Sequence, residues 1–450
     1  MHRIVFTLLY VVACSTGLAA QPLRGAGGPE LRALSLSDAV ELASRGNFDL
    51  RLAEYEKQSA EADFHKTLSV ILPRLSASEI FVSTQDPLGV FGLKLRQSDV
   101  SVADFNPVTL NAPSTRQNFT TKIEVRQPLL NVDGFFGRYA AGKSAEAAGF
   151  RVERARHGVE LATKSAYFQL VLARESRGVI RDALRAAEAY RTQAKDFYDQ
   201  GLIQRSDYLM TDVRVLDLTR AGAEADNAIA RAENGLRLLL GLADAVGVEP
   251  TDTLAFAPLD SVVYDIEQVN AGRSDMKAMR AGLDALGGMS NMARSGFLPT
   301  INAFADYEWN SLHLSATQGK AWTVGAVAQW NIFSGFDQVG DIEKSAARRS
   351  GMEAEYAKLV VENAGELRVA SGTLATSRHL VDLSRAMEAQ SAEQLRITEE
   401  RYATGLERTS DLLQAEAAHS NARLKYLEAV FQHTVAGYTM EFLLERKVAK

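Results

Sequence analysis

Residues 198–209 read YDQGLIQRSDYL, and a second copy of this pattern, YATGLERTSDLL, occupies residues 402–413. Both copies place Gly-Leu and Ser-Asp at the same spacing. Glycine commonly ends a helix in the left-handed conformation, and serine commonly caps the start of the next helix. We therefore expect two helical hairpins with turns at 199–206 and 403–410, and with Ser206 and Ser410 as the N-caps of the returning helices.

The segments around these turns are suited to very long helices. Residues 129–249 and 300–450 contain no proline, and proline breaks helix interiors. Helices from about Phe136 to Tyr198 and from about Phe336 to Tyr402 would be about 95 and 100 Å long, at about 1.5 Å per residue. Polar helices of this length gain their stability from packed neighbours, so we expect them to pair.

Other motifs also occur twice and in the same order, which indicates a duplicated fold. We expect repeats at 36–245 and 262–447, joined by a linker at 246–261, with a further linker at 21–35. The first repeat is expected to open with one helix, capped near Ser37, that runs to Leu-Pro. The paired motifs are GNFDL (46–50) with GRSDM (272–276), LPRL (72–75) with LPTI (298–301), and QPLL (127–130) with QWNI (329–332).

Each repeat also contains two predicted strands, at about 74–86 and 119–128 and at about 300–309 and 322–330. Thr121, Ile123 and Val125 alternate with the charged residues 122, 124 and 126, so an apolar face lies opposite a charged one. A soluble sandwich would turn the charged face to outside water. A membrane barrel would turn that face to its lumen and the apolar face to lipid.

All three tryptophans, Trp309, Trp322 and Trp330, belong to the second pair of strands. Trp309 and Trp322 flank the connecting loop, and Trp330 lies about 20 Å away in height. Aromatic belts at the two membrane interfaces would have this spacing; the core of a soluble hairpin is the alternative. Four strands are too few for a barrel, which needs about eight, so a barrel would require an oligomer. The first connecting loop, 87–118, is long, and we assign no ligand to it.

The start of the chain, residues 1–20, is typical of a cleavable secretory signal peptide. Its only cysteine, Cys14, follows a weak lipoprotein-like pattern. Two interpretations of Cys14 are open: it is lipidated, or it is an ordinary apolar residue of a signal peptide that is removed. Elsewhere, no run of 18 apolar residues predicts a membrane helix.

Composition excludes several classes of function. The net charge of -6 gives no support for nucleic-acid binding. The seven histidines are scattered, without a pair at ligand spacing. We find no catalytic set, cofactor motif or metal site, so a hydrolase has no basis in this sequence.

Together, the duplicated pieces resemble the TolC family of outer-membrane channel-tunnel proteins. The resemblance spans nearly the whole mature chain, from LSDAV at 36–40 to the second turn. It implies a mainly helical fold with membrane β-structure, in which a homotrimer forms a 12-strand barrel in the outer membrane, in contact with its lipid, and a helical tunnel through the periplasm.

The same resemblance implies a passive exit duct rather than an enzyme. Its partners would be a periplasmic adaptor (a membrane fusion protein) and an inner-membrane transporter of RND, ABC or MFS type. Drug efflux, metal efflux and type I secretion are all served by such ducts. The rival hypothesis is a soluble periplasmic adaptor or scaffold built of long helical hairpins.

The resemblance also assigns roles at the two turns. Asp207 and Tyr402 match groups that tie neighbouring coiled coils in the closed tip, and Asp411 matches an aspartate around the constriction. The family's arginine falls at Glu407 here, so the neighbouring Arg408 is the candidate for the closing salt bridge, with Arg205 as another. The alternative for both aspartates is a favourable place in the first turn of a helix.

The tips of the turns are candidate contacts for the adaptor. Gly201-Leu202 and Gly405-Leu406 would present leucine at an exposed end. Packing of each leucine against its own helix cap is the alternative.

Overall fold

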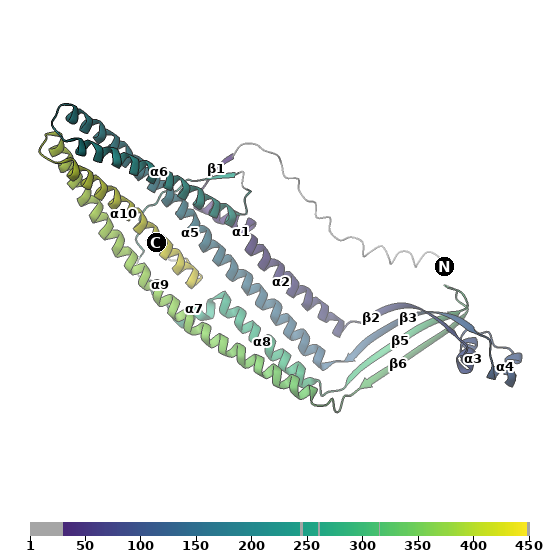
Figure 1. Ribbon diagram of the computed structural model, residues 1–450. Helices are drawn as coiled ribbons and strands as arrows, with labels where there is room; N and C mark the ends of the chain where they lie inside the picture. Colours follow the sequence, from purple (N-terminus) through teal and green to yellow (C-terminus); the bar gives the residue numbers. More distant parts are fainter. Residues whose placement is uncertain (1–29, 244–245, 260–261, 315, 448–450) are drawn as a thin grey trace.

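The computed structural model describes residues 30–243, 246–259, 262–314 and 316–447. The predicted signal peptide and Cys14 lie outside these residues. The molecule is long, with a sheet at one end and paired helical turns at the other (Figure 1).

Two long helical hairpins dominate the chain, as expected. Helices α5 (Val132–Asp199) and α9 (Asp337–Ala403) have 68 and 67 residues, or about 100 Å each at about 1.5 Å per residue. Each is followed by a partner of 36 residues, α6 (Arg205–Leu240) and α10 (Thr409–Leu444). Among the described residues, no helix combines the length and the apolar character needed to cross a membrane.

Small side chains bring these helices together. Helix α5 packs against α6, α8 (Ser274–Ser295) and α10. Its buried positions include a row of alanines, and alanine favours helix while it allows close approach of the axes. The row comprises Ala140, Ala147, Ala173, Ala183, Ala187 and Ala194.

The first helix of the chain differs from the prediction, because it is broken. Helix α1 (Leu36–Gly46) is capped by Ser35 rather than Ser37, and α2 (Phe48–Lys66) begins after Asn47. The Asn47 side chain accepts from Leu50 N at 3.1 Å and donates to Leu239 O at 3.0 Å. Asn47 of the GNFDL motif therefore joins the two helices and fastens them to the end of α6. A 3₁₀ turn, η1 (Thr67–Val70), follows α2.

The segments expected to be plain linkers, 21–35 and 246–261, instead supply a pair of strands. Strand β1 (Glu30–Leu34) runs parallel to β4 (Val246–Pro250). Beside this pair, the hydroxyl of the fully buried Tyr167 lies 2.6 Å from Asp252 Oδ2 and 2.9 Å from Leu34 O. Burial, together with the hydrogen bond to Asp252, raises the pKa of Tyr167 to about 12. The main apolar core lies here, midway along the molecule.

In the second half of the chain, an ionic cluster occupies the equivalent joint. Arg273 separates α7 (Ile266–Gly272) from α8, is 2% exposed and donates to Asp275 at 2.6 Å. Burial raises the pKa of the Asp275 carboxyl. The hydrogen bond from Arg273 and the charge of Arg154 lower this pKa by more than burial raises it, so the net pKa is below its usual value. Glu445, at the end of α10, accepts from Ser274 N at 2.9 Å.

Four antiparallel strands form the sheet in the order β2-β3-β5-β6. They are somewhat displaced from the predicted ranges, and β6 ends one residue before Trp330. Their bounds are β2 (Arg74–Thr84), β3 (Arg116–Leu130), β5 (Thr300–Ser311) and β6 (Gly319–Gln329).

The connection 87–118, expected to be an irregular loop, contains three short helices. They are α3 (Pro87–Arg96), the 3₁₀ helix η2 (Val102–Phe105) and α4 (Pro107–Asn111). Pro87 and Pro107 stand at the first helical positions of α3 and α4, where the missing N–H costs no hydrogen bond. Asp86 and Asn106 cap the two α-helices. Two of the three prolines in this connection therefore start helices, and Pro113 follows α4.

The close crossing of α1 and α6 gives a prediction on stability. A Cβ at Gly241 would lie 2.2 Å from Gly46 O, and Gly241 has φ +66. We expect Gly241→Ala to destabilise the protein by about 2 kcal/mol through overlap and backbone strain. Gly235→Ala is the control on the same helix, since a Cβ there meets nothing within 4 Å. Thermal unfolding of the two purified variants checks this, and equal midpoints would contradict it.

Candidate functional site

The two helical turns lie side by side at one end of the molecule (Figure 1). Gly201 and Gly405 have φ +73 and +76, in the left-handed region that glycine adopts without strain. Leu202 N donates to Phe197 O at 2.8 Å, and Leu406 N donates to Arg401 O at 2.9 Å. These bonds close each helix end in the way expected of a glycine cap.

The start of each returning helix differs from the prediction. Gln204 and Arg408 are the N-caps, so Ser206 and Ser410 are the second residues of their helices. The carboxylate of Asp207 reaches back to Gln204 N at 3.3 Å, which starts α6 earlier than a serine cap would.

Both candidate aspartates therefore occupy the same place, the first turn of a returning helix. Asp207 and Asp411 are partly exposed, and Ser410 Oγ lies 3.3 Å from Asp411 Oδ1. Acidic groups are stabilised at this end of a helix. Within one chain, Asp207 thus caps the start of α6, as the alternative interpretation expected. Both aspartate carboxylates remain accessible to solvent.

Tyr402 is buried between the two hairpins. Its ring lies 5.8 Å from that of Phe197 on α5, and its hydroxyl lies 3.2 Å from Thr409 Oγ1. Glu407 accepts from Arg401 at 2.8 Å, while Arg408 is exposed. The turn of α9 and α10 is thereby packed onto α5.

Two of the polar contacts between the hairpins lie near the turns, and our sequence reasoning missed both. Glu416 of α10 is 2% exposed and accepts from Arg214 of α6 at 2.7 Å. Tyr190 of α5 donates to Glu399 of α9; burial and this bond raise the pKa of Tyr190. A signal existed for Glu416, a carboxylate within the otherwise apolar stripe of Leu412, Ala415 and Ala422.

At the other end of the molecule, the sheet has two unlike faces. Register places Ile123 opposite Tyr307, and Tyr307 opposite Trp322, on one face. We call this the apolar face, with Leu75, Ala77, Val125, Trp309 and Val324 as further members. The charged face comprises Ser76, Ser78, Lys122, Glu124, Asp306, Glu308 and Thr323.

The apolar face is uncovered, whereas the charged face pairs its own charges. Trp322 is 72% exposed and Val324 is 68% exposed. Lys122 Nζ lies 3.1 Å from Glu124 and 3.4 Å from Asp306. Side chains of this kind are stable against lipid on one side and water on the other.

The three tryptophans lie at different heights on the sheet. Trp309, partly buried, contacts Tyr307 with ring centroids 4.7 Å apart. Trp330 directly follows the C-terminal end of β6, and its Nε1 donates to Phe297 O at 2.9 Å. An indole with its ring exposed and its N–H satisfied suits a boundary between apolar and polar surroundings.

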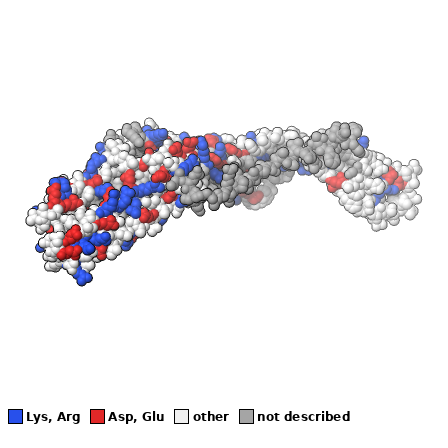
Figure 2. All heavy atoms as spheres, turned by 90° about the horizontal axis from the view of Figure 1, so that it is seen from above, with Lys and Arg blue, Asp and Glu red and all other residues white. Residues whose placement is uncertain are grey.

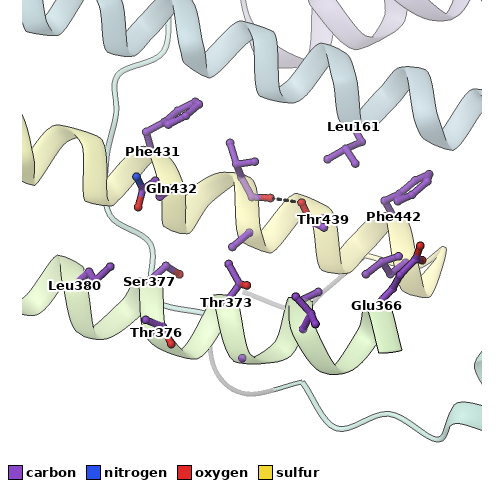
Figure 3. Close-up of a pocket in the computed structure, with 16 residues that line it drawn as sticks. Leu161, Glu366, Thr373, Thr376, Ser377, Leu380, Phe431, Gln432, Thr439 and Phe442 are labelled. Carbon is purple, nitrogen blue, oxygen red and sulfur yellow. Dashed lines mark hydrogen bonds between the residues drawn. The ribbon is translucent and has the colours of Figure 1, made fainter. Parts of the chain in front are cut away.

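A groove of about 1000 Å³ runs between α9 and α10. Figure 3 shows Thr373, Ser377 and Leu380 of α9 along one side and Phe431 and Phe442 of α10 along the other. Its lining is mostly apolar or small, which is typical of a surface that receives another helix. In the described part of the chain, no group of three or more His, Cys, Asp and Glu is arranged to hold a metal ion.

Comparison with known proteins gives a consistent result. The family model for the outer membrane efflux protein matches residues 39–242 and 266–444. The chain is 22% identical over 432 residues to the proteases secretion protein PrtF of Dickeya chrysanthemi, covering 92% of this chain and 89% of that protein. It is 24% identical to the probable outer membrane lipoprotein SilC of Salmonella typhimurium, covering 89% and 83%.

A solved structure has the same fold. The CmeC outer membrane channel of Campylobacter jejuni aligns with a TM-score of 0.79 at 18% identity, covering 91% of this chain and 85% of that one. The two matched segments of the family model contain both long hairpins and all four strands of the sheet. The chain therefore belongs to the outer membrane efflux protein family.

Proposed function

We propose that three copies of this chain assemble into a passive duct. Their sheets would close a 12-strand barrel in the outer membrane, and their helical hairpins would form a tunnel below it. Within each chain, the repeats would span 36–245 and 262–447. The exit-duct role follows from the family, and the trimer and its partners are our inference.

The observation that carries this proposal is the open sheet. Strands β2 and β6 each have a neighbour on one side only among the described residues. Unpaired strand edges cannot remain in lipid, because each N–H or C=O group without a hydrogen-bond partner there has a free-energy cost of several kcal/mol. Pairing of β2 with β6 of the next copy satisfies both edges, and repetition about an axis closes the ring.

The groove between α9 and α10 supports the same assembly. Val369, beside Ala370 on its lining, is 70% exposed although it is apolar. A helix of a neighbouring copy would cover this surface, as expected for closed cyclic oligomers.

The soluble adaptor hypothesis conflicts with the apolar face. A soluble chain would leave Trp322, Val324 and Trp330 in water, and patches of this kind mark membrane or protein contacts. In the duct, Trp309 and Trp322 would lie near the outer interface and Trp330 near the inner one.

Partners are proposed from the family and from the named relatives. PrtF, by its name, serves the secretion of proteases. We extend to this chain the general arrangement in which a periplasmic adaptor and an inner-membrane transporter deliver the cargo. The energy would then come from the transporter, which fits a chain proposed to act as a passive conduit.

Gel migration of outer-membrane fractions tests the assembly. Unheated samples should contain a band of trimer size that collapses to the monomer on heating, because paired strands in a closed barrel resist detergent. Recovery of the protein in the soluble or inner-membrane fraction, with no heat-dependent band, would favour the adaptor hypothesis.

At the tip, we propose that Asp411 lines the constriction, with Asp207, Tyr402 and Arg408 closing it. Three carboxylates around an axis attract cations; each contributes about 0.5 kcal/mol at about 8 Å in water. We expect Asp411→Asn to lower the cation preference of single channels in planar bilayers severalfold. Asp63→Asn, the same chemical change on the exposed face of α2, is the control. Unchanged selectivity in Asp411→Asn would remove Asp411 from the constriction.

We also propose that Leu202 and Leu406 contact the adaptor. They are 67% and 71% exposed, so they do not pack back on their own caps. A photo-crosslinker at position 406 should capture the adaptor in cells. The same label at Leu52, exposed on α2, should not. Capture of other copies of the channel alone would contradict adaptor docking at this turn.

A further inference from the structure

We propose that residues 85–115, called here the lid segment, fold into the barrel lumen at its outer end. We infer that the lid segments of three copies meet on the axis and close the mouth. This inference rests on the proposed trimeric duct. It concerns the end of the molecule opposite the helical turns.

The lid segment lies on the charged face, which is the lumen face of the barrel. Arg96, at the end of α3, approaches β6 so closely that a Cβ on Gly319 would lie 1.7 Å from Arg96 O. Gly319 pairs with Asn310, on the same face as Glu308. Arg96 Nη1 also lies 4.0 Å from Glu308. The segment that leaves β2 therefore crosses the lumen face to the opposite edge strand.

A buried amide network fixes the segment in this position. Gln97 is fully buried, donates to Asn118 Oδ1 at 2.9 Å and accepts from Arg116 Nε at 2.7 Å. Asn118 in turn donates to Thr120 Oγ1 and to Asn310 Oδ1, both at 2.8 Å. Buried amides with satisfied partners specify one arrangement, because any displacement leaves unpaired polar groups.

Charged side chains of the lid segment pair within it or with the sheet beside it. Lys94 pairs with Asp104 at 2.5 Å, and Asp99 pairs with Arg116. The hydrogen bond from Lys94, followed by bonds from Ser101, lowers the pKa of Asp104 to about 2. These bonds favour the ionised form of the carboxylate.

The free surface of the lid segment is apolar. Val102 is 91% exposed, and four other large apolar side chains are also exposed. Val90 is buried, and the Phe91 ring contacts the ring of Phe105. Figure 2 shows few charged atoms at this end of the molecule. The further exposed residues are Leu88, Leu95, Phe105 and Val108.

The size of the barrel identifies what covers this surface. Twelve strands about 4.8 Å apart, tilted by about 40°, enclose a barrel about 24 Å across. A helix with its side chains is about 10 Å thick. Three lid segments on the inner wall would therefore reach one another, and their apolar surfaces would be buried together. The occupant is thus the same segment of the neighbouring copies.

Access to a cysteine below the lid tests this inference. Ser76 lies on the charged face of β2, opposite Glu124, well inside the barrel. In intact cells expressing Ser76→Cys, a maleimide carried on a polyethylene glycol chain should react slowly from outside. Adding Val102→Asp places three like charges together on the axis, and adding Gln97→Ala removes the anchor. We expect about tenfold faster labelling in both.

Thr317→Cys is the control, because Thr317 is exposed on the β5–β6 loop outside the lid segment. Its labelling should be fast and unchanged by either substitution. If Ser76→Cys reacts as fast as Thr317→Cys in the parent, or if Val102→Asp has no effect, the closed lid is overturned although the duct stands. If Thr317→Cys is not labelled in intact cells and no trimer forms, the duct and the lid fail together.

Discussion

The unsatisfied edges of the four-stranded sheet are the constraint on which the rest of the structure depends. One chain supplies β2-β3-β5-β6, and among its described residues the outer strands β2 and β6 each have one unpaired edge, whereas lipid offers no hydrogen-bond partners. Charges on the charged face pair with one another, while the apolar face is left exposed by the part of the chain that the structure describes. A sheet with two open edges is stable in a membrane only as part of a closed ring, and the proposed trimer rests on this argument.

The long helices connect the sheet to the turns at the other end of the molecule. Alanines along α5 allow close packing, while Asn47 and Arg273 occupy the joints between α1 and α2 and between α7 and α8. Near the turns, Arg214–Glu416 and Tyr190–Glu399 hold one hairpin against the other. Buried polar pairs of this kind cost more to separate than to keep, so the relative position of the hairpins is set by a few groups.

Local chemistry explains what the sequence could and could not predict. The turns at Gly201 and Gly405 and the alternation along β3 depend on short-range preferences, and both are present in the structure. The start of α6 differs from the predicted one, because the Asp207 carboxylate accepts from Gln204 N and the helix begins before Ser206. The pairing of β1 with β4 joins segments more than 200 residues apart, and neither segment carries a local signal for its partner. The apolar stripe around Glu416 could have marked this carboxylate as buried, but its partner Arg214 could not be predicted without knowing which helices touch.

Hydrogen exchange of the backbone amides in the assembled, lipid-embedded protein tests the central claim most directly. Closed barrels leave no free edge, so the amides of β2 and β6 should exchange as slowly as those of the inner strands β3 and β5. Fast exchange along β2 and β6, with slow exchange confined to β3 and β5, would show an open sheet and contradict the account.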